Sequence, residues 1–412
     1  MNINLRNYNS PLKALFFMIG FITLFGCTEP FDIENDRIED FLVINATVTD
    51  QVSNQRIVLS RTFGFEESEP IPEEGASIVI IENNLTEYPF NENSPGEYYS
   101  VQEFGVTAGN EYKLTVRTAN GRSYSSQKVI APQPTSIDRV YAKRMVNDQG
   151  TDGIGVFLDT FDPTGNSLYY RYGFEETSKF TAPNWISTDI TSSAQGSDVT
   201  FAYVERPESE RVCYISGRSN SINIANTSSL TEDRIQDLSI NFIPVDDIRV
   251  SERYSILVKQ YVQTREAQSF YRVLNDFSGS ESLFSQIQPG FIRGNIVSET
   301  DTDENVLGYF DVSSLAEERI FFNRSEFISE IPFVLDCEPF TPEPDLEVPN
   351  AYQRFLQSLI GLIRGNTVRL LNPTPLPPPP PPEVFPVFTF VPRICGDCTA
   401  VGKSEVPEFW ID

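Results

Sequence analysis

The sequence predicts a mainly β protein, in which an N-terminal sandwich of immunoglobulin or transthyretin type precedes a second β-rich domain with one or two helices and a proline-rich C-terminal arm. Three observations lead to this prediction. Short runs of β-branched and aromatic residues recur between turn residues. Within the predicted domains, a helical period of apolar residues first occurs after residue 264. Prolines concentrate beyond Cys337, and six are consecutive at residues 377–382.

The first unit is expected over residues 41–132. Its strands are predicted at residues 42–48, 55–60, 76–81, 97–101, 112–117 and 123–126. The last two strands flank Asn120-Gly121, a dipeptide that supplies the positive φ angles of a tight hairpin. Several strands at this spacing, with no helical period between them, indicate an antiparallel sandwich.

The second unit is expected over residues 133–335 and is also mainly β. Strands are predicted at residues 155–159, 168–172 and 254–259. The proline and glycine within residues 162–166 set a turn between the first two of these strands.

One amphipathic helix is predicted within the second unit. Phe270, Val273, Leu274 and Phe277 follow the helical period, which places them on one face, and Thr264 is the expected N-cap. We expect this apolar stripe to pack on the β domain; docking of the stripe on a partner is the alternative.

A hairpin is predicted between residues 291–297 and 306–311. At its tip, Asp301, Asp303 and Asn305 copy the first three ligands of a calcium loop. Such a loop then needs a glycine and a bidentate glutamate, and the sequence has Val306 and Val312 at those positions. We therefore expect a polar hairpin tip and no metal site.

Residues 336–412 form the proline-rich C-terminal segment, in which a short helix is predicted at residues 351–363. The six consecutive prolines favour an extended polyproline II conformation. Two interpretations are open. The segment is either an arm that docks on a partner, or a strap laid across the β domain and pinned by Cys395 or Cys398.

The beginning of the chain has the features of a lipoprotein signal peptide. Arg6 and Lys13 precede an apolar run that is shorter than the roughly 20 residues needed to span a bilayer, and no acidic residue precedes Cys27. Cys27 ends Leu-Phe-Gly-Cys, so we expect residues 1–26 to be removed and Cys27 to be diacylated, with residues 27–40 as an acidic tether. The alternative is an ordinary secreted protein with a chance cysteine at this position.

The composition excludes several function classes. The formal net charge is −27, and removal of residues 1–26, whose only charged residues are Arg6 and Lys13, makes it −29. Nucleic-acid binding is therefore not expected. The chain contains no histidine, which excludes histidine general bases, histidine zinc ligands and histidine-containing catalytic triads. Catalysis by a pair of carboxylates needs no histidine and stays open.

Four cysteines remain once Cys27 is lipidated: Cys213, Cys337, Cys395 and Cys398. In an oxidising compartment we expect them to form structural disulfides, for which three connectivities exist. A redox or metal-binding Cys-Gly-Asp-Cys pair at residues 395–398 is the alternative.

The mature chain resembles a lipoprotein family of the Bacteroidota known as domain of unknown function 4249. The features that carry the resemblance are Cys27 with its acidic tether and, in order, residues 42–44, 75–79, 96–98, 112–114, 121–126, 294–296, 307–310, 395–398 and 407–410. Acidic residues after the lipidated cysteine are similar to the signal that exports Bacteroidota lipoproteins to the outer face of the outer membrane; a tether facing the periplasm is the alternative. The resemblance implies an outer-membrane lipoprotein associated with a TonB-dependent receptor, and it supplies no catalytic residue.

The sequence thus leads us to expect a surface-exposed, non-enzymatic lipoprotein that binds a nutrient or acts as an accessory subunit of a TonB-dependent transporter, with no cofactor. A small molecule or a glycan is the expected class of ligand. Two alternatives are an assembly subunit of an envelope complex and a carboxylate-dependent glycan hydrolase. Two facing carboxylates in a cleft would favour the hydrolase, whereas exposed apolar or aromatic side chains on a β surface would favour binding.

Overall fold

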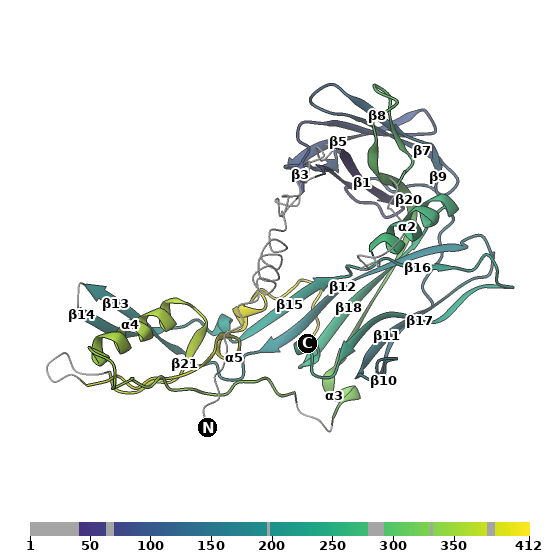
Figure 1. The fold of residues 1–412 in the computed structure, drawn as a ribbon. Helices are drawn as coiled ribbons and strands as arrows, with labels where there is room; N and C mark the ends of the chain where they lie inside the picture. Colours follow the sequence, from purple (N-terminus) through teal and green to yellow (C-terminus); the bar gives the residue numbers. More distant parts are fainter. Residues whose placement is uncertain (1–40, 63–69, 196–197, 279–291, 330–332, 377–383) are drawn as a thin grey trace, which may run out of the picture.

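The computed structural model describes residues 41–62, 70–195, 198–278, 292–329, 333–376 and 384–412 of the 412-residue chain. The predicted signal peptide, Cys27, the acidic tether and the six consecutive prolines lie outside the described residues. The described chain is mainly β, as predicted, and is arranged as two sandwiches and a distal lobe (Figure 1).

The first sandwich confirms the strands predicted before residue 132. In β1 (Leu42–Thr49) the side chains of Leu42, Ile44 and Ala46 are buried and alternate with more exposed ones, as expected for a strand with one face on a core. The sequence pattern does not predict β5, because that strand is mostly polar and contains Pro89. The remaining elements of this unit are β2 (Arg56–Arg61), β3 (Ile71–Pro72), β4 (Ser77–Glu82), β5 (Thr86–Ser94), β6 (Glu97–Ser100), β7 (Glu111–Arg117), β8 (Ser123–Ser126) and β9 (Val129–Ile130).

The tight turn between β7 and β8 is confirmed. The N–H of Gly121 donates to the carbonyl of Thr118 at 2.9 Å. Only the glycine of the Asn120-Gly121 pair has a positive φ, at 87°. The turn therefore has one residue in the left-handed region, whereas the Asn-Gly pair predicts two residues with positive φ.

The predicted hairpin of residues 291–297 and 306–311 is wrong, because its two strands pair with different neighbours. β19 (Ile296–Ser298) pairs antiparallel with β8, whereas the first half of β20 (Val306–Asn323) pairs in parallel with β1. The second half of β20 pairs antiparallel with β18 (Arg253–Val262) of the second sandwich. One strand thus belongs to both sandwiches. Ile296, Val306 and Phe310, which the sequence assigns to the second unit, lie in the core of the first.

β19 and β20 meet through a side chain. The Asn295 amide nitrogen donates to the Phe310 carbonyl at 2.9 Å, and the Phe310 N–H donates to Asn295 Oδ1 at 2.8 Å. On its other side β20 lies close to β1, and this approach depends on Gly308, which has a φ of 108°: a Cβ at this position would lie 1.9 Å from the carbonyl oxygen of Ile44. The strands of the first sandwich thereby enclose one core.

The second sandwich packs a sheet in the order β15-β12-β18-β20 against the three-stranded sheet β10-β11-β17. Tyr172 and Ile256 from one sheet and Ile154 and Val156 from the other are buried between them. The strands predicted at residues 155–159 and 254–259 fall within β11 and β18, and the strand predicted at residues 168–172 overlaps β12, which begins one residue later. The elements of this unit not yet given are β10 (Arg139–Val146), β11 (Asp152–Asp162), β12 (Tyr169–Thr181), β15 (Val212–Arg218), β16 (Asn223–Asn226), β17 (Asp233–Pro244), η1 (Glu208–Glu210), η2 (Ile248–Val250) and α3 (Arg324–Phe327).

The predicted helix is confirmed as α2 (Arg265–Ser278), and Thr264 caps it, since Thr264 Oγ1 accepts the N–H of Ala267 at 3.1 Å. The predicted stripe is only partly buried. The ring of Phe270 stacks on Tyr309 with centroids 4.9 Å apart, but Val273 is 40% exposed. The most buried face of α2 is centred on Ala267 and the neighbouring Gln268, so the prediction that the whole stripe is core is wrong at Val273.

The distal lobe combines two segments that are far apart in the sequence. The hairpin of β13 (Thr188–Gln195) and β14 (Asp198–Glu205) leaves the second sandwich between β12 and β15. The proline-rich segment adds α4 (Ala351–Arg364), which confirms the predicted helix, and the paired strands β21 (Val368–Asn372) and β22 (Thr389–Pro392). Two short helices, α5 (Arg393–Gly396) and η3 (Cys398–Ala400), then return the chain to the second sandwich.

Candidate functional site: the distal lobe and its disulfide root

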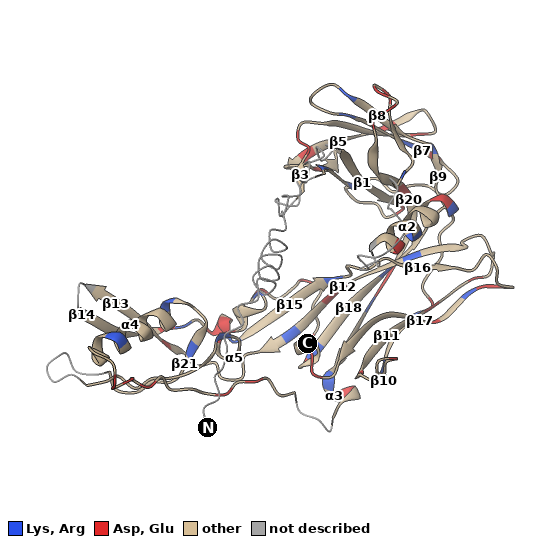
Figure 2. Cartoon of the chain, viewed as in Figure 1, with Lys and Arg blue, Asp and Glu red and all other residues tan. Residues whose placement is uncertain are grey.

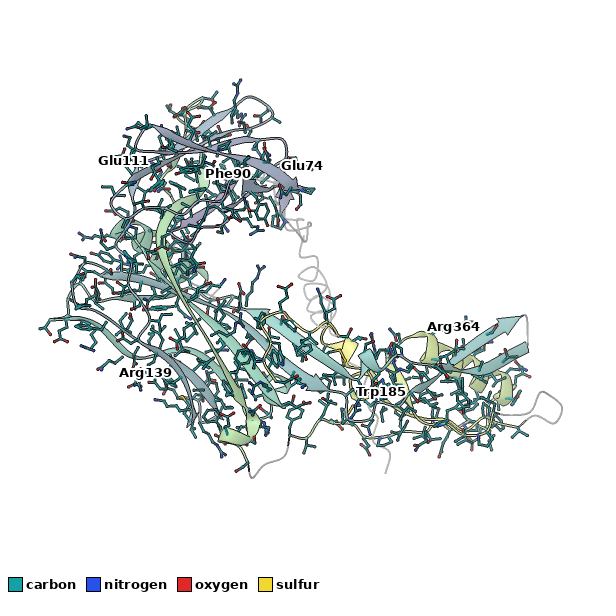
Figure 3. The ribbon with its side chains drawn as sticks, turned by 180° about the vertical axis from the view of Figure 1, so that it is seen from behind. Glu74, Phe90, Glu111, Arg139, Trp185 and Arg364 are labelled. Carbon is teal, nitrogen blue, oxygen red and sulfur yellow. A yellow bond between two sulfur atoms is a disulfide. The ribbon has the colours of Figure 1, made fainter. Side chains whose placement is uncertain are left out.

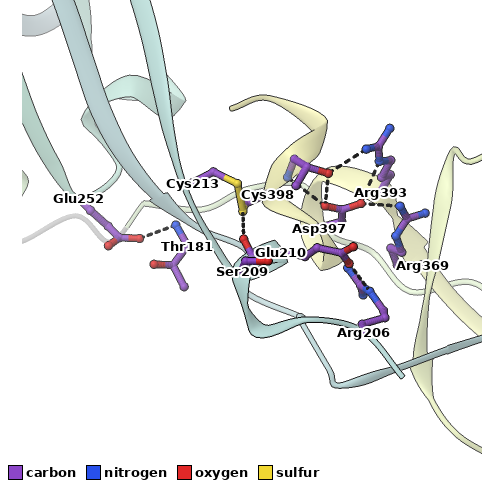
Figure 4. Close-up of a disulfide and its surroundings, with 11 residues drawn as sticks. Thr181, Arg206, Ser209, Glu210, Cys213, Glu252, Arg369, Arg393, Asp397 and Cys398 are labelled. Carbon is purple, nitrogen blue, oxygen red and sulfur yellow. Dashed lines mark hydrogen bonds and ion pairs between the residues drawn. A yellow bond between two sulfur atoms is a disulfide. The ribbon is translucent and has the colours of Figure 1, made fainter. Parts of the chain in front are cut away.

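The four cysteines form two disulfides, Cys213–Cys398 with an S–S distance of 2.00 Å and Cys337–Cys395 with 2.09 Å. The prediction of structural disulfides is confirmed. The Cys-Gly-Asp-Cys pair is not a redox pair here, because its two cysteines bond to different partners. Figure 4 shows the first disulfide, where Cys213 of β15 meets the chain returning from the lobe.

A small apolar core surrounds this disulfide at the root of the lobe. Phe180, Ala182, Cys213 and Cys398 are buried together, and Trp185 packs against them. Figure 3 shows Trp185 at the root, with Arg364 on α4 farther out along the lobe. The root is therefore fixed by packing as well as by covalent bonds.

Asp397, between the two cysteines, is the centre of a buried ion cluster. Its carboxylate pairs with Arg369 of β21, lies 3.0 Å from Arg393 Nε, and accepts the Thr399 N–H at 2.9 Å (Figure 4). Burial alone would raise the pKa of Asp397, but the hydrogen bonds from Thr399 and Arg393 and the charge of Arg369 hold the pKa below its ordinary value. Arg369 Nε also lies 3.4 Å from Asp189 of β13, so the cluster ties both segments of the lobe to its root.

The lobe has its own hydrophobic core. Its buried members come from both segments and are Ile190, Phe355, Leu359, Val368, Leu370, Phe388 and Phe390. Next to this core, the N–H of Thr374 donates to the hydroxyl of Tyr203 at 2.9 Å, and Thr374 Oγ1 donates to the carbonyl of Val387 at 2.8 Å. The proline-rich segment is thus pinned at Cys395 and Cys398, as the strap interpretation expects, but it lies on the β13–β14 hairpin instead of across the second sandwich.

Exposed apolar side chains are frequent on the lobe. Phe340 is 40% exposed, Leu346 71% and Val387 60%. Phe340 is held in place because its backbone forms a bridge with Phe390 of β22. Apolar groups on a fixed backbone can be buried by a partner at a small further loss of conformational freedom.

Charged residues are distributed over both sandwiches and the lobe (Figure 2). On the outer sheet of the second sandwich, Glu175 and Glu317 both pair with Lys259, whose Nζ lies 2.6 and 3.4 Å from their carboxylates. Burial lowers the pKa of Lys259, but the hydrogen bond and charge of Glu175 outweigh this effect and raise the pKa. Both carboxylates are therefore engaged in ion pairs with the same lysine.

Several carboxyl groups of the described residues have pKa values below their ordinary range. They are Glu82, Glu97, Asp152, Asp162, Asp237, Asp247, Glu304, Asp397 and Asp412. The general acid of a glycoside hydrolase needs the opposite shift, a raised carboxyl pKa.

A cavity of about 660 Å³ lies beside α2, lined by Phe270, Val273, Asn295 and Tyr309. It adjoins the junction of the two sandwiches. Asn295 is engaged with Phe310, so the cavity wall is part of the contact that closes the first sandwich.

In the part of the chain that the structure describes, no helix has the length and apolar character to cross a membrane. The same residues contain no group of three or more cysteine, aspartate or glutamate side chains placed to hold a metal ion. In the stretch that copies the first three ligands of a calcium loop, the Asp303 N–H donates to the Asp301 side chain at 3.0 Å, as in an ordinary polar turn.

Comparison with known proteins identifies the family. The sequence matches the family model of the domain of unknown function DUF4249 over residues 28–319. The chain belongs to this family. The DUF4249 match covers both sandwiches and the β13–β14 hairpin and ends within β20, so the proline-rich part of the lobe lies beyond it.

No curated protein matches the chain. Among solved structures, InvD of Yersinia pseudotuberculosis is similar at 12% identity, with a TM-score of 0.15. The similar region covers 54% of this DUF4249 chain and 64% of the InvD chain, and the likeness is too weak to inform the fold or the function.

Two features of the structure have contacts that the sequence alone does not reveal. One is the ion cluster of Asp397, for which the only hint in the sequence is an aspartate between two cysteines. The other is residues 407–410, which the family resemblance includes. Trp410 packs against Tyr214 and Phe321 with ring centroids at 4.9 and 5.7 Å, so this segment covers the outer face of the second sandwich.

Proposed function

We propose that the protein is an outer-membrane lipoprotein, anchored through Cys27 and facing the cell surface, that acts as a non-enzymatic binding or accessory subunit of a TonB-dependent transporter. The acidic tether separates the folded part from the membrane. A net charge of −29 after removal of residues 1–26 repels anionic lipid, which favours contact with protein over contact with the lipid surface.

The observation that carries the proposal is the distal lobe with its root of two disulfides and a buried ion cluster. Such a root keeps the lobe in one orientation relative to the second sandwich. A fixed orientation lowers the entropy lost on binding, because the lobe that carries the exposed side chains of Phe340, Leu346 and Val387 does not have to be oriented when the partner binds. The lobe therefore has the properties of a preformed contact surface for another protein.

The proposal favours binding over glycan hydrolysis. The shifted carboxyl groups have lowered pKa values, and Glu175 and Glu317 are bridged by Lys259. The lowered pKa values are the opposite of the raised pKa that a general acid needs, and the ion pairs with Lys259 engage Glu175 and Glu317. The role of an assembly subunit would use the same lobe, and the identity of the partner distinguishes it from a transporter subunit.

Two experiments test the proposal. In the first, Cys27→Ser should release the protein from the membrane fraction or leave it unprocessed. The lipid anchor is disproved if this variant stays with the outer membrane after a carbonate wash.

In the second, the wild-type protein should co-purify with a large β-barrel after mild solubilisation of native membranes. The double variant Phe340→Asp/Val387→Asp should retain less of that barrel, because it places charge on the lobe surface. Leu85→Asp is the matched control, since Leu85 is 85% exposed on the first sandwich and its replacement should leave the complex intact. Equal loss of the barrel in the control and the lobe variant would disprove the role of the lobe.

A further inference from the structure

Among the described residues no strand pairs with the outer edge of β14. β14 is antiparallel to β13 from Thr188↔Glu205 to Gln195↔Asp198 with no register shift. β21 and α4 lie against β13. Among the described strands β14 pairs with β13 alone, and the residues around Thr374 reach β14 through the side chain of Tyr203. An unpaired edge presents backbone donors and acceptors to a further strand.

The hydrogen bonds around β13 show which groups face outward. The N–H of Arg206 donates to the carbonyl of Ser187 at 2.9 Å, which makes Arg206 a bonded position, and such positions alternate along an antiparallel pair. The N–H of Ile190 fits this pattern, since it bonds to the Asp189 side chain and not to β14. The residues of β14 whose N–H and C=O point away from β13 are therefore Val199, Phe201, Tyr203 and Glu205.

The other long edge strands of the described structure are protected. β10 carries Arg139 and Lys143, and β17 is interrupted by two register shifts. β15 is covered by a bridge to Lys403, and β22 by a bridge to Phe340. β14 has none of these devices: residues 198–205 contain no lysine, arginine, proline or glycine and no bulge.

The side chains of β14 suit a strand that is extended by a partner. Phe201 and Tyr203 pack against the lobe core, while Thr200, Ala202 and Val204 are exposed on the opposite face. Arg206, whose side chain is 5% exposed, pairs with Glu210 at 2.7 Å and fixes the end of the strand to the root of the lobe. One face of β14 is thus exposed, and the strand is attached to the lobe core and to the root.

We propose that the β14 edge binds an extended segment of a different polypeptide, which adds a strand to the β13–β14 hairpin and carries a basic residue beside Glu205. The negative charge of the chain favours a basic segment of another polypeptide over a second copy of this chain. Glu205 and Glu208 are exposed at the end of β14, and a second copy, with a net charge of −29 after removal of residues 1–26, would be repelled. The inference deepens the proposed function, on which it rests for the identity of the partner.

The test is site-specific photocrosslinking in the full-length protein in native membranes. A photoreactive phenylalanine replaces Thr200, Ala202 or Val204 in turn, and Gln353, exposed on α4, is the control position. The three β14 positions should crosslink to one short segment of another polypeptide, moving along it by two residues per step, with yields about tenfold above the control.

A matched pair of variants tests the backbone contact. Glu205→Pro removes an outward N–H from the edge, and Glu205→Ala removes only the charge. The ladder of crosslinks should be lost in Glu205→Pro and only weakened in Glu205→Ala. Thiol titration and the melting temperature of both variants establish that the lobe stays folded.

The outcomes separate this inference from the proposed function. If a barrel co-purifies but β14 crosslinks no better than Gln353, the inference is wrong and the proposed function stands. If β14 gives the crosslink ladder with a polypeptide that is not a barrel, the inference stands and the transporter role falls. Crosslinks to a second copy, or an unchanged ladder in a folded Glu205→Pro variant, would overturn the inference.

Discussion

Cys213 of β15 and Cys398 of η3 are 185 residues apart in the sequence and are joined by a disulfide. Five residues farther on, Lys403 continues the attachment, because its carbonyl accepts the N–H of Tyr214 at 2.8 Å and its own N–H donates to the Tyr214 carbonyl at 3.1 Å. The chain that leaves the second sandwich to build the distal lobe is thereby fastened to an edge strand of that sandwich on its return.

The first prediction concerns this link. In the Cys27→Ser background, Cys213→Ala/Cys398→Ala should lower the free energy of unfolding by about 5 kcal/mol in the chain-entropy account, because it opens a loop of 185 residues. Cys337→Ala/Cys395→Ala opens a loop of 58 residues and should cost about 4 kcal/mol. Urea unfolding measures both values. Two or more free thiols in the unreduced, denatured Cys27→Ser protein would contradict the disulfide assignment.

A second prediction concerns the closure of the first sandwich. Asn295→Ala should lower the free energy of unfolding by about 2–3 kcal/mol, because it leaves the buried N–H and C=O of Phe310 without their partner. Asn93→Ala, at an exposed position of β5, is the control and should stay within about 0.5 kcal/mol of wild type. Similar losses in the two variants would contradict the assigned role of Asn295.

Two glycines with positive φ should respond differently to alanine. Gly308→Ala should cost about 4 kcal/mol or more, since its Cβ would overlap the carbonyl of Ile44. Gly121→Ala meets nothing within 4 Å and should cost about 1 kcal/mol through its φ alone. Thermal unfolding compares the stabilities of the two variants. A Gly308→Ala protein as stable as Gly121→Ala would show that β20 does not lie as close to the Ile44 carbonyl of β1 as the structure has it.

The fourth prediction follows from the lowered pKa of Asp397. A carboxyl group whose pKa is lower in the folded state stabilises that state above its unfolded pKa, near 3.8, and the stabilisation is lost as the pH falls through the folded value. Asp397→Asn should therefore lower the free energy of unfolding at pH 7 by about 3 kcal/mol, and the difference from wild type should shrink below about pH 4. Asp148→Asn, at an exposed loop position, is the control. A difference that is constant between pH 7 and pH 3 would contradict the role of this carboxylate.

Local sequence signals predicted much of the fold. Strands such as β1 and β11 have β-branched residues at buried positions, and Thr264 begins α2 where the period changes. Both patterns are set by residues close together in the sequence, so they can be recognised without knowing the tertiary structure.

The remaining features depend on pairing between distant residues. β20 joins two sandwiches because its halves meet β1 and β18, and neither pairing leaves a local pattern. The β13–β14 hairpin is rich in serine and threonine and becomes part of a core only with α4 and Phe388. For the same reason the sequence allowed three disulfide connectivities. The ion pair of Asp397 likewise depends on Arg369 of β21, which lies 28 residues away in the sequence.

The most direct test of the central claim is the mass of the full-length protein after mild solubilisation of native outer membranes, measured by native mass spectrometry. The account predicts a complex in which this 46.5 kDa chain, less its signal peptide and with its lipid, is bound to a single large β-barrel. The same complex should lose the barrel in the Phe340→Asp/Val387→Asp variant. Recovery of the wild-type protein only as a free monomer would contradict the account.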